Sequence, residues 1–530
     1  MQKVSEGYGE NRGRKQAVLF FGAFVYALLF ALGSQIEQFG ATTWGKSLAR
    51  FAVAFPIAFV ALALLLSGLM PRLASVRETK AKQPFHTGIA FLLIFTSFLP
   101  MFLIEYPGSF VYDSHSHAMQ VSSHVYSTFH PLLYTLLLRA NIAAYTYGLV
   151  QSFEKCMATT MLLQMLIVSL CFALSCASLS RSCSRRAARG ALAAFMLWPY
   201  HAALASNYTK DTLFSAFLTL FFALTLEMLQ ARRINRSIFA GATVCGALAC
   251  LMRNNMIYAM LVWGVLLLFG HKPTRQIAVC ALAACALCVG VNAALMTALH
   301  ADGGDVREML SIPAQQLARA YALSPESFDE EDRKQLDALI GNQNYLQYDP
   351  TIADRVKNSI DIETLRADPA GAAAFWLRIG KRCPGIYLDA FLNTALPMLY
   401  PYRAYASTPD YIETGLAEYA VAPPFGQEEP VQPRRFQVVR EWLDANVWSN
   451  GAKDIPVLRW VMNAGVVIWL MLLTVLFAMY TGSWQRFAVL LLPVLLWGTY
   501  LLGPVIQGRY LYPFVCLLPL MLAACKTKEE

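Results

Sequence analysis

Charged residues are scarce in this sequence. Asp, Glu, Lys and Arg make up only 15% of its 530 residues, whereas a soluble globular domain carries about a quarter. Hydrophobic residues make up 57%, and apolar runs near the length that spans a bilayer recur along the chain. Together these two features exclude an ordinary soluble protein. We therefore predict an all-α fold, that of a polytopic helical membrane protein.

Several signatures of other protein classes are also missing. The sequence has no P-loop, Rossmann fingerprint or nucleophile elbow, which disfavours ATP-driven transport. Most of the twelve cysteines lie inside apolar runs, where cysteine behaves as a small apolar residue and not as half of a disulfide. The first apolar run follows three basic residues, as in a signal peptide, but no small-residue cleavage site follows it. We interpret that run as a retained anchor.

The apolar runs and the basic loops together predict the topology. We place about twelve spans near 17–33, 51–70, 87–104, 156–176, 187–205, 211–230, 237–252, 255–270, 277–299, 457–480, 486–504 and 509–525. Alternate loops are rich in Lys and Arg, and the positive-inside rule assigns those loops and both termini to the cytoplasm. Two long segments, 105–155 and 300–456, then lie outside the cytoplasm.

This topology divides the chain into three parts. Residues 1–299 form an N-terminal membrane module of about nine spans that contains the loop 105–155, and residues 457–530 form a C-terminal module of about three spans. Between them, residues 300–456 form an extracytoplasmic helical region with a net charge of −8, while the rest of the chain carries +17. The basic residues lie in short loops, a pattern that gives no support to nucleic-acid binding.

Helical patterns also occur in the two long outer segments. Apolar residues recur with helical spacing over 130–149, which predicts a helix lying at the membrane interface; a thirteenth, marginal span is the alternative. Residues 326–339 predict a helix with Ser324 as its cap and Pro325 at its first position. The amphipathic segment 370–399 should break at Pro384 into two short helices.

The polar stretch 105–134 is the strongest candidate for a catalytic loop. It holds Asp113, Gln120 and four of the eight histidines. Asp113 could simply face water, but a carboxylate in this place could also take a proton from an acceptor hydroxyl. His130 could cap the interfacial helix that Pro131 opens, or it could point at a substrate phosphate.

A divalent metal is a second use for this loop. Asp113, His115 and His117 are ligand types that hold such ions, here Mg or Mn. Their spacing is loose, however, because residues two apart on a helix face different sides. The metal site therefore stays an open alternative to a metal-free loop.

Charged residues at the predicted outer ends of spans form another candidate group. Charged side chains in such places can snorkel to the interface without having any functional role. Three cations on one face would also suit a lipid-linked phosphate, with arginine binding it as a fork and lysine as a point charge. The donor-binding candidates are Lys210, Asp211, Arg253, Arg509, Tyr510 and Gln120.

These motifs together resemble a known superfamily. The pieces YPGSFVYDSHSHAMQ, YSTFHPLLYTLLL, SNYTKDTLF, LMRNNMIYA, SIPAQQLARAY and QGRYLYP span residues 106–513. Their order and predicted side of the membrane resemble the GT-C superfamily of membrane glycosyltransferases, and more closely the uncharacterised bacterial DUF6020 group.

The resemblance implies a function. It implies a membrane glycosyltransferase that moves sugar from a polyprenyl-phosphate donor to a cell-envelope glycan or lipid acceptor, outside the bacterial cytoplasmic membrane. Asp113 would match the loop base or metal ligand, and Arg509 the basic residue near the donor phosphate. A lipid-linked glycan transporter or polymerase is the alternative, with Pro199, Pro493 and Pro504 as its candidate helix breaks. A non-enzymatic envelope assembly protein is a third interpretation.

Overall fold

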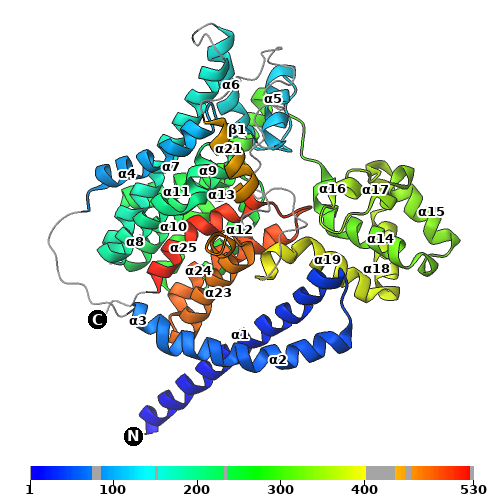
Figure 1. The fold of residues 1–530 in the computed structure, drawn as a ribbon, viewed down its shortest axis with the longest axis horizontal. Helices are drawn as coiled ribbons and strands as arrows, with labels where there is room; N and C mark the ends of the chain where they lie inside the picture. The colour runs from blue at the N-terminus through cyan, green and yellow to red at the C-terminus, as the bar shows by residue number, and fades with distance from the viewer. Residues whose placement is uncertain are drawn as a thin grey trace.

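The computed structural model describes residues 2–74, 85–110, 112–147, 149, 153–231, 235–401, 436–448 and 455–525. Over these residues it is helical apart from one pair of two-residue strands (Figure 1). The first half contains α1 (Gln2–Phe39), α2 (Trp44–Leu64), α3 (Met70–Ala74), α4 (Thr87–Ile104), β1 (Ser109–Phe110), α5 (Tyr112–Ser123), α6 (Leu132–Thr146), α7 (Phe153–Ser182), α8 (Arg185–Leu197), α9 (Pro199–Ala205), β2 (Asn207–Tyr208), α10 (Lys210–Gln230), α11 (Arg236–Met252), α12 (Met256–Leu268) and α13 (Lys272–Leu299). The second half contains α14 (Ser311–Leu323), α15 (Glu330–Leu339), α16 (Asp354–Lys357), α17 (Ile362–Ala367), α18 (Pro369–Arg382), α19 (Pro384–Leu399), α21 (Gln437–Leu443), α22 (Leu458–Val461), α23 (Ala464–Thr481), α24 (Trp484–Leu501), the 3-10 helix η7 (Gly508–Leu511) and α25 (Tyr512–Ala524).

Many of these helices have the length and composition of membrane spans. Eight described helices are long and apolar enough to cross a bilayer, and three shorter ones, at 236–252, 256–268 and 508–524, are also apolar. The protein is therefore a polytopic membrane protein, as the composition predicted. Helix α6 belongs to neither group, which favours the interfacial helix over a thirteenth span.

Helices occupy every segment that we predicted as a span, but two of them are interrupted. The segment 187–205 is divided because α8 ends at Leu197 and Pro199 begins α9. The segment 457–480 is divided because Asn463 caps α23 after the short α22. Pro493 lies inside an unbroken α24, and Pro504 follows the end of that helix. Of the three prolines expected to break helices, only Pro199 separates two helices.

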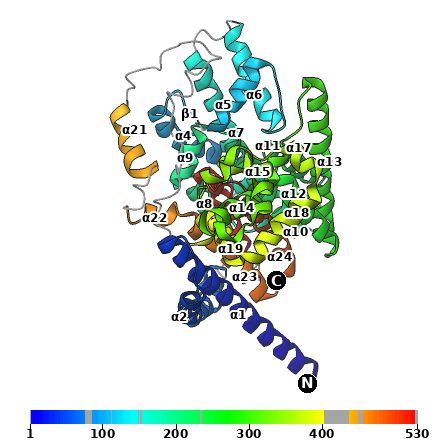
Figure 2. The ribbon, with the colours of Figure 1, turned by 90° about the vertical axis from the view of Figure 1, so that its right-hand side faces the viewer.

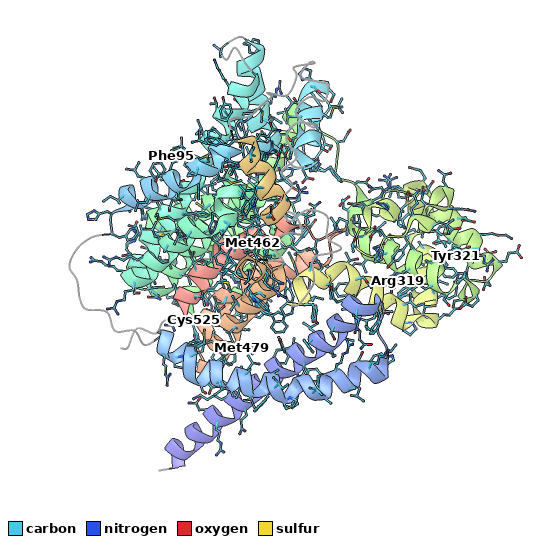
Figure 3. The ribbon with its side chains drawn as sticks, viewed as in Figure 1. Phe95, Arg319, Tyr321, Met462, Met479 and Cys525 are labelled. Carbon is cyan, nitrogen blue, oxygen red and sulfur yellow. The ribbon has the colours of Figure 1, made fainter. Side chains whose placement is uncertain are left out.

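Helix α10 is the centre of the largest apolar core. It is more buried than the other long apolar helices, with Phe214, Phe221 and Phe222 fully enclosed, and it packs against α7, α11 and α25. Met462 lies near the middle of the body in Figure 3, where Tyr200 Oη donates to its carbonyl at 3.5 Å. The first residues of α10, Lys210 and Asp211, therefore belong to a firmly packed helix.

The helical region of residues 311–399 has a separate core. Phe328, Leu336, Phe375 and Ile379 are buried within it, and it forms the right-hand part of Figure 1. Helix α14 links it to the hairpin of α1 and α2, because Arg319, labelled in Figure 3, donates to the carbonyl of Gly40. Thr42 Oγ1, in the same turn, donates to Asp389 Oδ1 at 2.7 Å.

Two local predictions in this region have different outcomes. The break at Pro384 is confirmed, because α18 ends at Arg382 and Pro384 begins α19. The predicted start of the helix at 326–339 is wrong. A 3-10 turn occupies Pro325–Ser327, and α15 begins at Glu330 because Asp329 and Asp332 form a capping box.

Candidate functional site

A short pair of parallel strands organises the candidate site. Ser109 of β1 lies opposite Asn207 of β2, and Phe110 lies opposite Tyr208. Because parallel strands end at the same edge, the residues that follow them come together. Asp113 follows β1 in the first turn of α5, and Lys210 and Asp211 follow β2 at the start of α10. The predicted loop 105–134 is thus partly helical.

Buried hydrogen bonds hold this strand pair in place. Gln164 of α7 donates from Nε2 to the carbonyl of Asn207 at 2.8 Å and to that of Ala205 at 3.1 Å. Ser114, beside Asp113, donates to the carbonyl of Tyr208. Helix α7 therefore fixes the backbone on the β2 side of the site, and Ser114 ties the start of α5 to the same strand.

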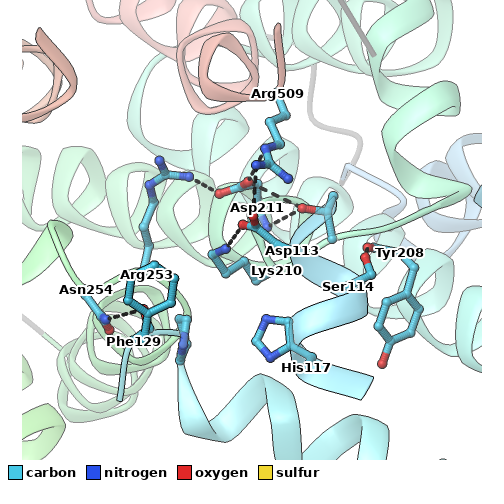
Figure 4. Close-up of polar contacts among 12 residues, drawn as sticks. Asp113, Ser114, His117, Phe129, Tyr208, Lys210, Asp211, Arg253, Asn254 and Arg509 are labelled. Carbon is cyan, nitrogen blue, oxygen red and sulfur yellow. Dashed lines mark hydrogen bonds and ion pairs between the residues drawn. The ribbon is translucent and has the colours of Figure 1, made fainter. Parts of the chain in front are cut away.

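Asp113 pairs with two cations from distant parts of the chain (Figure 4). Lys210 Nζ binds its Oδ2 atom, and Arg509 Nη2 donates to its Oδ1 atom at 3.1 Å. Arg509 comes from η7, just before the last helix. The structure therefore brings together Asp113, which the sequence placed in a polar loop, and Lys210 and Arg509, which it placed at the ends of two different spans.

A second aspartate continues the network. Asp211 is fully buried, its Oδ1 atom pairs with Arg253 Nη1, and its Oδ2 atom lies 3.7 Å from Arg509 Nε. Arg509 thus contacts both aspartates. Three cations and two carboxylates give this cluster a net charge of +1, so it retains an attraction for anions. We call these five residues the charge cluster: Asp113, Lys210, Asp211, Arg253 and Arg509.

Aromatic and amide side chains fix Arg253. Its guanidinium carbon lies 4.4 Å from the ring centroids of both Tyr500 and Tyr510, a favourable cation–π distance. Its Nε atom donates to Asn255 Oδ1 at 3.0 Å, and Asn255 Nδ2 donates to Thr499 at 2.8 Å. Tyr510 was predicted at the site; Asn255 lies in the motif LMRNNMIYA but was not singled out, and Tyr500 was missed because it lies inside an apolar run.

The members of the charge cluster differ in how far they are exposed. The side chain of Asp113 is 16% exposed, those of Lys210 and Arg253 are both 11% exposed, that of Arg509 is 6% exposed, and that of Asp211 is not exposed at all. Asp113 is therefore the most exposed member of the charge cluster, and Asp211 is closed to solvent. Asp211 serves mainly to neutralise Arg253 and Arg509, which revises its predicted role as a direct donor ligand.

The neighbouring cations set the protonation of Asp113. Burial raises its pKa, but Lys210 and Arg509 lower it more, so the pKa lies well below the usual aspartate range. Asp113 is therefore ionised at neutral pH and is a weak base while both cations remain beside it. Removing their charge would leave burial as the dominant influence and would raise the pKa.

The loop histidines lie close to this cluster. Rings of His117 and His130 are 4.9 Å apart, and His117 Nδ1 lies 2.7 Å from Thr135 Oγ1. Burial, followed by the charge of Lys210, lowers the pKa of His130 to about 4, and burial also lowers the pKa of His117. Both imidazoles are therefore neutral at pH 7.

The structure describes the side chains of only two of the three predicted metal ligands, Asp113 and His117. Both carboxylate oxygens of Asp113 already bind cationic donors, which a divalent ion would have to displace. Among the described residues no group of three His, Cys, Asp or Glu could hold a metal ion. The side chain of His115 lies outside what the structure describes. Gln120 is not in the charge cluster either, because its Oε1 atom accepts from the Ser127 amide at 3.0 Å.

Comparison with known proteins assigns a family. The sequence matches a family described as being of unknown function, DUF6020, over residues 121–530. The chain belongs to the DUF6020 family. No curated protein matches the sequence, and no solved structure matches it. The match includes four members of the charge cluster, whereas Asp113 precedes it.

Proposed function

We propose that this DUF6020 protein is a membrane glycosyltransferase that takes sugar from a polyprenyl-phosphate donor. The observation that carries the proposal is the charge cluster, which has a net charge of +1, lies at the ends of apolar helices and holds one accessible carboxylate. A lipid phosphate needs cations near the headgroup plane. A hydroxyl acceptor needs a base within reach of the same phosphate.

Donor binding begins beside Asp113, the most exposed member of the charge cluster. Lys210 contributes a point charge, and Arg509 contributes a planar fork that matches phosphate oxygens. Both cations pair with Asp113 in the resting protein, so the phosphate must compete with this carboxylate. Asp211 and Tyr510 keep Arg253 and Arg509 in place behind the phosphate.

Competition for these cations would also activate Asp113. When the phosphate takes Lys210 and Arg509, the charges that lower the pKa of Asp113 are neutralised, while its burial remains. The carboxylate then becomes a stronger base only after the donor is bound. This order protects the donor, because an acceptor or water is not activated at an empty site.

The transfer step follows from this arrangement. The acceptor hydroxyl oxygen attacks the anomeric carbon, the bond from that carbon to the phosphate oxygen breaks, and the hydroxyl proton passes to Asp113. The bonding electron pair leaves with the phosphate, whose additional charge faces Lys210 and Arg509. Cations fixed where charge develops stabilise the transition state more than the ground state. A single displacement of this kind inverts the sugar configuration.

The proposal also covers the superfamily, the membrane and the topology of the protein. We place the chain among GT-C-like enzymes of the bacterial cytoplasmic membrane, with about twelve spans and both termini in the cytoplasm. The charge cluster and the helical region 311–399 then face outward. The acceptor is a cell-envelope glycan or lipid, and no step described here uses a metal ion.

A lipid-linked glycan transporter is the second candidate. The break between α8 and α9 at Pro199 favours it, because transporters use broken helices to line their substrate sites. His201 follows that break, is fully buried and lies 3.3 Å from Tyr512 Oη through Nδ1. An ionisable side chain inside a membrane bundle often marks a transport path.

One experiment separates the two candidates. Purified protein is incubated with a short-chain polyprenyl-phosphate sugar and a lipid or glycan hydroxyl acceptor, and released polyprenyl phosphate is measured. A glycosyltransferase releases it together with an acceptor product. A transporter releases none, but moves a fluorescent lipid-linked sugar across proteoliposomes. Movement without release would reject the proposed transfer reaction.

A further inference from the structure

A basic pocket lies at the other end of α11 from the charge cluster. Helix α11 begins at Arg236, and Arg253 of the charge cluster follows directly after its last residue. Its 17 residues span about 25 Å at the usual helical rise, which is close to the thickness of a bilayer core. The pocket and the charge cluster therefore face opposite membrane surfaces, whichever surface is cytoplasmic.

The pocket is formed where the first turns of α11 and α13 meet. It has a volume of about 440 Å³, which lies in the usual range for ligand sites. Helix α13 runs along the edge of the helical body in Figure 2. Its lining consists of Arg236, Phe239, Lys272, Arg275, Gln276 and Val279.

The charges in this pocket are all of one sign. Arg236, Lys272 and Arg275 are exposed, and no acidic residue lines the pocket or occupies the first turn of either helix in the part of the chain described. Helix N-termini carry a partial positive charge of their own, so cations are unfavourable there and anions favourable. Two helix N-termini and three cations therefore converge without a counter-charge from the pocket itself.

The apolar part of the lining indicates what kind of anion fits. Phe239 is half-buried and the Val279 side chain is 52% exposed, one turn below the cations on each helix. A free inorganic anion gains nothing from these two side chains. A phospholipid would place its phosphate among the cations and the start of its acyl chains against Phe239 and Val279.

We propose that this pocket binds the headgroup of an anionic phospholipid from the surrounding bilayer. Basic pockets between membrane helices bind such headgroups in the leaflet where anionic lipids gather. Basic residues are also expected wherever loops face the cytoplasm. That rule alone does not explain why these residues line a pocket between two helices together with Phe239 and Val279. The proposal does not depend on the glycosyltransferase assignment.

Lipid binding can be measured on the purified full-length protein. Native mass spectrometry in a neutral detergent gives apparent dissociation constants for added phosphatidylglycerol and phosphatidylcholine. The triple variant Arg236→Gln/Lys272→Gln/Arg275→Gln removes the pocket cations. The matched control, Arg185→Gln/Arg186→Gln/Arg189→Gln, removes three cations from the first turns of α8.

The expected result is selective. Wild type and the control bind phosphatidylglycerol more tightly than phosphatidylcholine, and the pocket variant binds phosphatidylglycerol about 10- to 100-fold more weakly, because it lacks the three cations that contact the bound phosphate. Equal weakening in the control variant would overturn the proposal, since the attraction would belong to the basic surface as a whole.

Two further arms complete the test. If glycerol 3-phosphate or inorganic phosphate displaces bound phosphatidylglycerol at similar concentrations, the site takes a soluble anion and the lipid assignment is wrong. If the triple variant does not fold, the single variant Lys272→Gln replaces it, because Lys272 is exposed at the start of α13. Unchanged lipid preference in Lys272→Gln would then count against the pocket.

Discussion

Arg509 donates to Asp113 at 3.1 Å although the two residues are 396 positions apart in the sequence. The contact joins the first turn of α5 to the 3-10 turn before the last membrane helix. It also links the two aspartates of the charge cluster, because Arg509 lies 3.7 Å from Asp211 as well. We therefore expect the loss of Asp113 and the loss of Asp211 to have different consequences.

Asp211 should be required mainly for stability. It is fully buried between Arg253 and Arg509, and removing one partner of a buried ion pair costs about 3–5 kcal/mol. We expect Asp211→Asn to lower the melting temperature of the purified protein strongly, as measured by loss of the monodisperse gel-filtration peak after heating. The control is Glu331→Gln in α15, where the residue is exposed. Equal melting temperatures for the two variants would contradict this role.

His130 should make stability depend on pH. Its pKa is about 4 in the folded protein and about 6.5 in an unfolded chain. As the pH falls from 6.5 to 4, the unfolded chain binds a proton that the folded protein does not. The free energy of unfolding then decreases, by about 3 kcal/mol at full effect. His130→Gln should reduce this loss and the exposed His86→Gln should not, as judged by melting temperatures across this pH range; the neighbouring His117 should account for part of what remains.

Arg509 should be needed for donor use. Removing a charged hydrogen-bond donor costs about 1.5–3 kcal/mol, so Arg509→Ala should lower kcat/KM for the lipid-linked donor by about 10- to 100-fold. Arg509→Lys should restore only part of this, because lysine keeps the charge and loses the fork. Arg366→Ala, an exposed position in α17, is the control. An unaltered donor dependence in Arg509→Ala would remove this residue from the site.

The proposed orientation can be tested by labelling. Of the twelve native cysteines, ten are buried and two are half-buried, so an impermeant thiol reagent should give little background. Gly341→Cys in the helical region 311–399 should react in intact cells, whereas Arg186→Cys should react only after permeabilisation. The opposite pattern would place the charge cluster in the cytoplasm and exclude an external lipid-linked donor.

Contacts between residues far apart in the sequence could not be predicted from the sequence alone. Apolar runs identified the membrane helices, since burial in lipid requires about twenty apolar residues in a row. Charges at the ends of these runs identified Lys210, Arg253 and Arg509, which the structure does bring together. The approach of Asp113 to Lys210 depends on the pairing of β1 with β2, and strands of two residues leave no periodic pattern in a sequence.

Three further differences between the prediction and the structure have local causes. Residues 112–123 form helix α5 although they are polar and rich in histidine, so no apolar period marked them. At α15, both Ser324 and Asp329 are good caps, and Asp329 is used because Asp332 completes a capping box with it. Asp211 was assigned to the donor because its burial and its pairing with Arg253 arise only in the folded protein.

The most direct test of the account is the activity of Asp113→Asn in a defined donor–acceptor assay. Asparagine keeps the size of the side chain but removes both the base and the charge that holds Lys210 and Arg509. We predict that the variant folds, still binds the polyprenyl-phosphate donor, and loses glycosyl transfer by about 10²–10⁴-fold, while Glu331→Gln is fully active. Full transfer activity in Asp113→Asn would contradict the account at its central residue.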